Sequence, residues 1–110
     1  ATEIFSQDAS VLGWTCGNLV APARDVAQFF YELLGPTPSI VSAESVAQMS
    51  QMSTLDHGWQ AGRLDYGLGL MIQNVNPQKQ VRPPLDDPGS YLGHGGFTYA
   101  YMSDSGWFPY

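Results

Sequence analysis

The sequence predicts an α+β fold, because two of its segments have the apolar spacing and end signals of helices and two others have the composition of strands. Of the 110 residues, 44% are hydrophobic and only 13% are charged, which suits one small core and differs strongly from the composition of a disordered chain. We therefore expect one domain, or part of one.

The clearest helix signal begins at Pro22, which suits the first helical position because its missing N–H would have no partner there. The apolar residues that follow have the spacing of one helix face: Val26, Phe29, Phe30, Leu33 and Leu34. Gly35 should end this helix, and Pro36 and Pro38 should prevent it from resuming.

A second helix should begin after Ser42, which is a favourable N-cap residue. Glu44 would lie in its first turn, where a negative charge is stabilising. A narrow apolar stripe follows at Val46, Met49 and Met52.

Two strands are expected, one at Tyr66–Ile72 and one at Phe97–Ser103, the second because of its aromatic content. In the first strand, Gly67 and Gly69 would share one face, where another backbone or ring can approach closely. The segments rich in glycine and proline or of mixed character should be irregular: residues 1–20, with a short extended or turn segment at Trp14–Val20, residues 53–65, residues 74–92 and residues 104–110.

The charge balance is acidic, with ten Asp and Glu against four scattered Lys and Arg, and a net charge of −6. No basic stripe follows a phosphate backbone, so we expect no nucleic-acid partner and attribute the acidity to solubility. No apolar run approaches the roughly 20 residues that span a bilayer, so no membrane segment is expected in this chain. Cys16 is the single cysteine, and with His57 and His94 it forms no metal-binding spacing. We expect neither a metal nor another cofactor.

Four short motifs follow one another along the chain: Gly17-Asn18-Leu19, Ala23-Arg24-Asp25-Val26-Ala27-Gln28-Phe29, Tyr66-Gly67-Leu68-Gly69 and His94-Gly95-Gly96. In type and order they resemble landmarks of the serine β-lactamase-related family, which includes class C β-lactamases, D-alanyl-D-alanine carboxypeptidases, D-aminopeptidases and esterases. The resemblance covers nearly the whole chain.

This resemblance implies a β-lactamase/transpeptidase-like fold, with an antiparallel sheet flanked by helices. Residues 1–110 would be a single partial domain, the C-terminal segment of the β-lactamase-like domain, without the family's final strand and closing helix. An open sheet edge is then expected unless a partner covers it. Family habit implies a periplasmic or extracellular location.

The resemblance also implies a site at the His-Gly-Gly motif. His94 would occupy the place of the family's catalytic lysine, and the backbone N–H of Phe97 would be one oxyanion-hole donor, a role typically worth about 3–4 kcal/mol of barrier. Gly95, Gly96 and Thr98 would bind substrate along the strand edge, because glycines leave the backbone accessible.

The family's nucleophile motif, Ser-x-x-Lys, does not occur, since Lys79 is the only lysine and Asn76 stands three residues before it. The resemblance therefore implies an acyl-enzyme hydrolase whose nucleophile is contributed by a partner, the N-terminal portion of the same hydrolase. Its substrates would be small acyl, peptide or β-lactam compounds. Tyr101-Met102-Ser103 matches the letters of the family's second motif but follows the third, so we interpret the match as chance.

Other interpretations stay open at this point. The chain can be a catalytically inactive binding or structural module derived from the family, and its aromatic residues, including Trp107 and Tyr99, can serve a peptide- or glycan-binding module. His94 can simply be satisfied by a loop carbonyl. His57, which has no motif around it, is expected to be an exposed loop residue.

Overall fold

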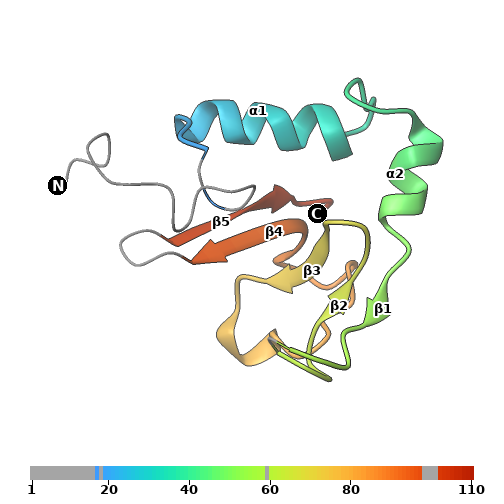
Figure 1. Ribbon diagram of the computed structural model, residues 1–110, viewed down its shortest axis with the longest axis vertical. Coiled ribbons are helices and arrows are strands. Elements are labelled where there is room, and N and C mark those ends of the chain that lie inside the picture. Colours follow the sequence, from blue (N-terminus) through green and yellow to red (C-terminus); the bar gives the residue numbers. More distant parts are fainter. Residues whose placement is uncertain (1–16, 18, 59, 98–101) are drawn as a thin grey trace, which may run out of the picture.

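The computed structural model describes residues 17, 19–58, 60–97 and 102–110, and it confirms the α+β class (Figure 1). Two helices and a five-stranded antiparallel sheet are present in this part of the chain, with the strands in the order β1-β2-β3-β4-β5. The elements are α1 (Ala23–Leu34), α2 (Ala43–Met49), β1 (Ser53–Thr54), β2 (Asp65–Tyr66), β3 (Met71–Asn74), the short 3-10 helix η1 (Pro77–Lys79), β4 (Ser90–Phe97) and β5 (Met102–Trp107). Each strand pairs with the next one along the chain.

The first predicted helix is confirmed by α1, which begins at Ala23; Pro22 is its N-cap residue and not, as predicted, its first helical residue. Three side chains of the predicted apolar face are buried: Phe30, Leu33 and Leu34. The predicted end is also right, because the N–H of Gly35 donates to the carbonyl oxygen of Tyr31 at 2.9 Å. A side chain at position 35 would overlap that oxygen, so glycine suits this stop.

The second predicted helix is confirmed by α2. The Oγ of Ser42 accepts a hydrogen bond from the N–H of Ser45 at 3.1 Å, as expected of an N-cap. The helix ends at Met49, so Met52 lies beyond its last turn. Three partly buried side chains nevertheless pack against the core from this region: Val46, Met49 and Met52.

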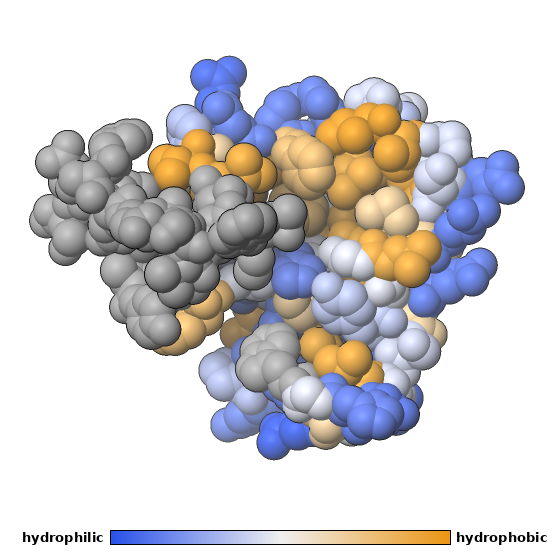
Figure 2. Space-filling model, in the orientation of Figure 1, coloured by the Kyte–Doolittle hydropathy of each residue, from blue (hydrophilic) through white to orange (hydrophobic). Residues whose placement is uncertain are grey.

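The core lies between α1 and the sheet. Its buried cluster consists of Phe30, Leu33, Leu34, Leu70 and Leu92. Complete burial of one such side chain stabilises the fold by roughly 1.5–3 kcal/mol. Helix α1 packs against β5 and runs above β4 and β5 (Figure 1), and apolar side chains gather at the end of α1 nearest α2 (Figure 2). The helix therefore supports β5 and, through Leu92 in the core cluster, also β4.

The prediction of one strand at Tyr66–Ile72 was wrong, because a tight hairpin divides this segment. Strand β2 ends at Tyr66, which pairs with Met71 at the start of β3. Gly69 has a φ of 74°, and the N–H of Gly67 donates to the carbonyl oxygen of Leu70 at 2.8 Å, so both glycines serve the turn. The expected close approach of another backbone holds for Gly67, where a side chain would overlap the carbonyl oxygen of Met49.

The boundaries predicted around the last two strands were also wrong. Residues 74–92 are not wholly irregular, since η1 forms there and β4 begins at Ser90. Residues 53–65, also expected to be a loop, include β1. The strand expected at Phe97–Ser103 is two strands, with β4 ending at Phe97 and β5 beginning at Met102. The expected tail at 104–110 instead continues β5 to Trp107, because pairing with β4 overrides the local effect of glycine.

Other expectations fall on residues that the structure does not describe. Residues 98–101, which lie between β4 and β5, are among them, and so is most of the extended or turn segment expected at Trp14–Val20.

Within the described chain, β1 and β5 are the edge strands of the sheet.

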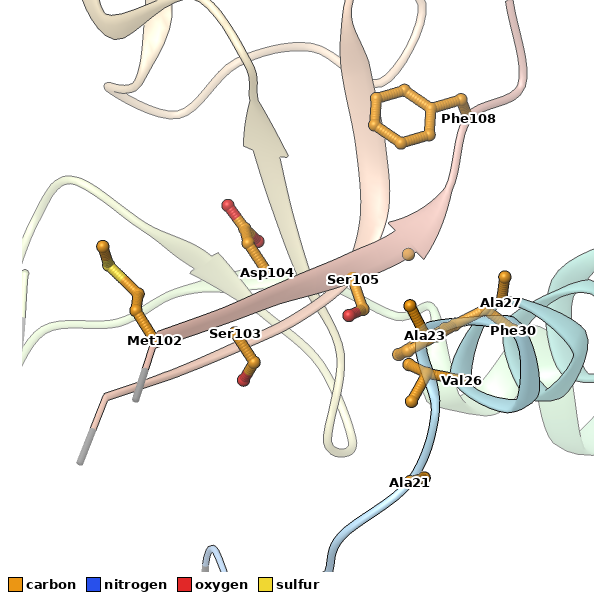
Figure 3. A pocket seen from close by; sticks show the side chains of 11 residues that line it. Ala21, Ala23, Val26, Ala27, Phe30, Met102, Ser103, Asp104, Ser105 and Phe108 are labelled. Carbon is orange, nitrogen blue, oxygen red and sulfur yellow. The ribbon is translucent and has the colours of Figure 1, made fainter. Parts of the chain in front are cut away.

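Strand β5 and the start of α1 border a groove of about 510 Å³. Along β5, Ser103 and Ser105 point to one side and Met102 and Asp104 to the other (Figure 3), as expected of a strand. In the part of the chain that the structure describes, no strand pairs with the outer side of β5.

Candidate functional site

The predicted site residues His94, Gly95, Gly96 and Phe97 form the last half of β4. On one side they pair with β5, from His94 opposite Ser105 to Phe97 opposite Met102. On the other side, the pairing of β4 with β3 stops at Gly93, opposite Met71. Among the described residues, no strand pairs with this second edge of residues 94–97. We call it the open edge of β4; Thr98, also predicted to bind substrate, lies outside the described residues.

Alternate residues of a strand turn their N–H and C=O groups to opposite edges. Every second residue of 94–97 therefore turns its main-chain groups away from β5 and toward the open edge. An extended ligand can add to such an edge through main-chain hydrogen bonds. The side chain of Phe97 is 81% exposed, so its bulk does not anchor the strand in the core.

His94 begins this half of the strand, and both of its ring nitrogens have partners within the chain. Its Nε2 lies 2.8 Å from the Oη of Tyr66, and its Nδ1 lies 2.6 Å from the carbonyl oxygen of Gly95. The two rings meet edge to face, with centroids 5.7 Å apart and planes at 86°. The alternative that a carbonyl oxygen satisfies His94 is therefore supported, although this oxygen belongs to the next residue of the same strand and not to a loop.

Tyr66 is the residue that sequence reasoning missed. Its motif was noted for the strand it would form, but the contact joins residues 28 positions apart and depends on the β2–β3 hairpin and on the β3–β4 pairing. No local pattern in the sequence indicates such a contact. The resemblance supplied only the order of the two motifs.

Gly95 and Gly96 have ordinary backbone conformations, since neither is among the residues with positive φ. An added Cβ at Gly95 would lie 3.4 Å from its nearest neighbour, the carbonyl oxygen of Ser103, which is ordinary contact. At Gly96 the nearest atom would be the Oγ of Ser103, at 2.9 Å, and that side chain can rotate. Packing therefore does not require glycine at position 95, and the effect of the pair is to leave this stretch of backbone without side chains.

A polar network lies next to Gly95. The buried Tyr91 places its hydroxyl against the carboxylate of Asp104 and 3.1 Å from the Oε1 of Gln73. Burial, followed by the hydrogen bond to Asp104 and the charge of that carboxylate, raises the pKa of Tyr91 above its usual value. The hydroxyl thus keeps its proton and joins β4 to β5 and β3. Tyr91 is therefore suited to stabilising the position of β4 and not to acting as a catalytic base.

The remaining candidates lie away from this site or outside the described chain. His57 is 87% exposed beside Asp56, as expected of a loop residue. Trp107 packs against the core cluster and meets the ring of Tyr31 edge-on, which disfavours it as an open ligand platform. Tyr99 and Tyr101 lie outside the described residues.

The described residues lack two kinds of feature. They contain no group of three or more His, Cys, Asp or Glu side chains placed to hold a metal ion. No helix among them has the length and apolarity to cross a membrane.

Comparisons of the chain with protein-family models, with curated proteins and with solved structures found no match.

Proposed function

We propose that this chain is part of a serine hydrolase of the serine β-lactamase-related type, with a β-lactamase/transpeptidase-like fold, and that β4 is its substrate-side strand. The observation that carries the proposal is the open edge of β4, which begins at His94 and runs along two glycines. A strand edge with a polar side chain at one end and bare backbone beyond it suits an extended acyl or peptide substrate.

Each residue has a distinct role in this proposal. Gly95 and Gly96 leave this stretch of the edge free of side chains, so a substrate can lie beside it as an added strand and bond to the main-chain groups that face the open edge. The N–H of Phe97 donates to the oxyanion that develops on the attacked carbonyl. His94 takes the place of the family's lysine at the start of the open edge, where its ring nitrogens bond to Tyr66 and to the carbonyl oxygen of Gly95. The serine nucleophile and its lysine come from the N-terminal portion of the hydrolase, because the sequence here contains no Ser-x-x-Lys. Substrates of the class are small acyl, peptide or β-lactam compounds.

The test begins with the intact mass of every chain in the native protein sample, combined with labelling by a fluorophosphonate or a fluorescent penicillin. The proposal expects a second chain, or a longer form of this one, that takes the label on serine. A 110-residue chain that occurs alone and stays unlabelled would contradict it.

One structural observation favours a second candidate, a catalytically inactive binding or structural module. Both ring nitrogens of His94 are engaged within the chain, so the side chain is satisfied without a substrate. Such a module should unfold cooperatively by itself, with one transition seen by both far-ultraviolet circular dichroism and tryptophan fluorescence. A hydrolase segment should instead gain stability when the nucleophile-bearing portion is added.

A further inference from the structure

The hydrogen bonds around His94 fix which nitrogen carries its proton. The carbonyl oxygen of Gly95, 2.6 Å from Nδ1, can only accept a hydrogen bond, so Nδ1 carries the hydrogen in the neutral ring. The other nitrogen, Nε2, is then an acceptor and receives the hydroxyl hydrogen of Tyr66 across 2.8 Å. In this state the single hydroxyl hydrogen of Tyr66 is used within the chain, and its oxygen has only lone pairs left for a ligand.

A second proton on His94 reverses this bond. The added proton binds to Nε2, which becomes a donor to the oxygen of Tyr66, and the hydroxyl hydrogen is released to donate elsewhere. We propose that the hydroxyl of Tyr66, which lies on β2 beside His94, contacts an anionic oxygen of a ligand at this end of the open edge of β4. His94 acts as a positioning residue that decides whether this hydroxyl accepts or donates a hydrogen bond. The pair takes up one proton in total, and no covalent bond other than those to hydrogen changes.

The surroundings place this donor beside the open edge of β4. Tyr66 ends β2, and His94 begins the stretch of β4 that β3 does not pair. Asp65 on β2 is engaged by Arg82, at 3.0 Å, and by Thr54. Asp104 on β5, opposite Gly95, is held by the hydroxyl of Tyr91. These are the charged groups on the strands around the pair, and each carboxylate has a partner of its own.

The inference rests on the proposed function only in taking the open edge of β4 as the place where a ligand lies. It can be tested on the chain itself, without hydrolase substrate, so failed labelling of a serine and failure of this inference are separate results. The first measurement is ¹⁵N NMR of the histidine rings in the unaltered protein. At a pH where the ring of His94 is neutral, the hydrogen should be on Nδ1, and exposed His57 serves as the internal reference. A hydrogen on Nε2 instead would overturn the inference.

The second measurement is a titration with methanesulfonate, which keeps its negative charge as the pH is lowered. It should bind at Tyr66 about tenfold more tightly once His94 is charged, because a charge-assisted hydrogen bond is then available. Tyr66→Phe keeps the edge-to-face ring and removes the hydroxyl, and it should abolish most of this gain while His94 still takes up its proton. Tyr31→Phe, on a half-exposed ring of α1, is the matched control and should retain it. An undiminished gain in Tyr66→Phe, or none in the unaltered protein, would show that Tyr66 is not the contact.

Discussion

Two glycines of β4, two positions apart, should respond in opposite ways to the same substitution. An added Cβ at Gly93 would lie 2.5 Å from the Cα of Gly106 and would overlap the carbonyl oxygen of Ser105, so backbone atoms of β5 would have to move. At Gly95 the nearest atom would be 3.4 Å away. The approach of β4 to β5 is therefore tight at position 93 and ordinary at position 95.

Gly93→Ala should reduce the free energy of unfolding by about 3 kcal/mol, the upper part of the usual range for overpacking, because rigid backbone opposes the new methyl group. Gly95→Ala should change it by less than about 1 kcal/mol, since alanine also restricts the unfolded chain slightly. For a domain of this size, each kcal/mol corresponds to roughly 4–8 °C in Tm. Gly93→Ala should thus lower the Tm by more than about 10 °C.

The assay is urea and thermal unfolding of both variants and the unaltered protein, followed by circular dichroism and tryptophan fluorescence. Equal midpoints for the two variants would refute the reasoning, because it depends on the different distances between β4 and β5 at these two positions. A destabilised Gly95→Ala with an unaffected Gly93→Ala would show that the register of the two strands differs from the one described.

Three further predictions concern the core, a helix cap and the alkaline limit of stability. Leu92→Ala should cost about 2–5 kcal/mol in urea unfolding, because Leu92 joins β4 to the helix side of the core, and a loss below 1 kcal/mol would contradict that placement. Ser42→Ala should cost about 1 kcal/mol by removing the cap of α2, while Ser39→Ala, outside the helix, should have little effect on the same unfolding curve. Because the pKa of Tyr91 is raised in the folded state, the neutral hydroxyl contributes fully to stability below the usual tyrosine pKa of about 10, and this contribution is lost as the pH rises beyond it. Tyr91→Phe should remove this part of the loss of unfolding free energy at alkaline pH. An unchanged dependence of the unfolding free energy on pH would count against the buried hydroxyl.

The helices were predictable because their signals are local. The proline before α1, the glycine after it and the serine before α2 act within one or two turns of the residues that they delimit. The apolar spacing of α1 likewise repeats within one segment. Nothing outside these segments was needed to place them.

The strands were less predictable because their limits are set by partners distant in sequence. Gly67 and Gly69 could belong to a strand or to a turn, and only the pairing of Tyr66 with Met71 decides between them. In the same way β5 continues past Gly106 because β4 lies beside it. The site shows the same limit: the motif indicated His94, but its partner Tyr66 becomes visible only when β2, β3 and β4 are placed together.

Among the described residues no strand pairs with the outer side of β5, and this edge bears on how the protein behaves at high concentration. Edge strands tend to join between molecules, and Asp104 in the middle of β5 would bring a negative charge into any such junction. The net charge of −6 adds a repulsion between whole molecules. Salt weakens both effects, since charges are screened over about 10 Å at 0.1 M ionic strength and over about 3 Å at 1 M. Light scattering should therefore show more association in concentrated salt than in dilute buffer, and low ionic strength should favour a dispersed solution of this protein.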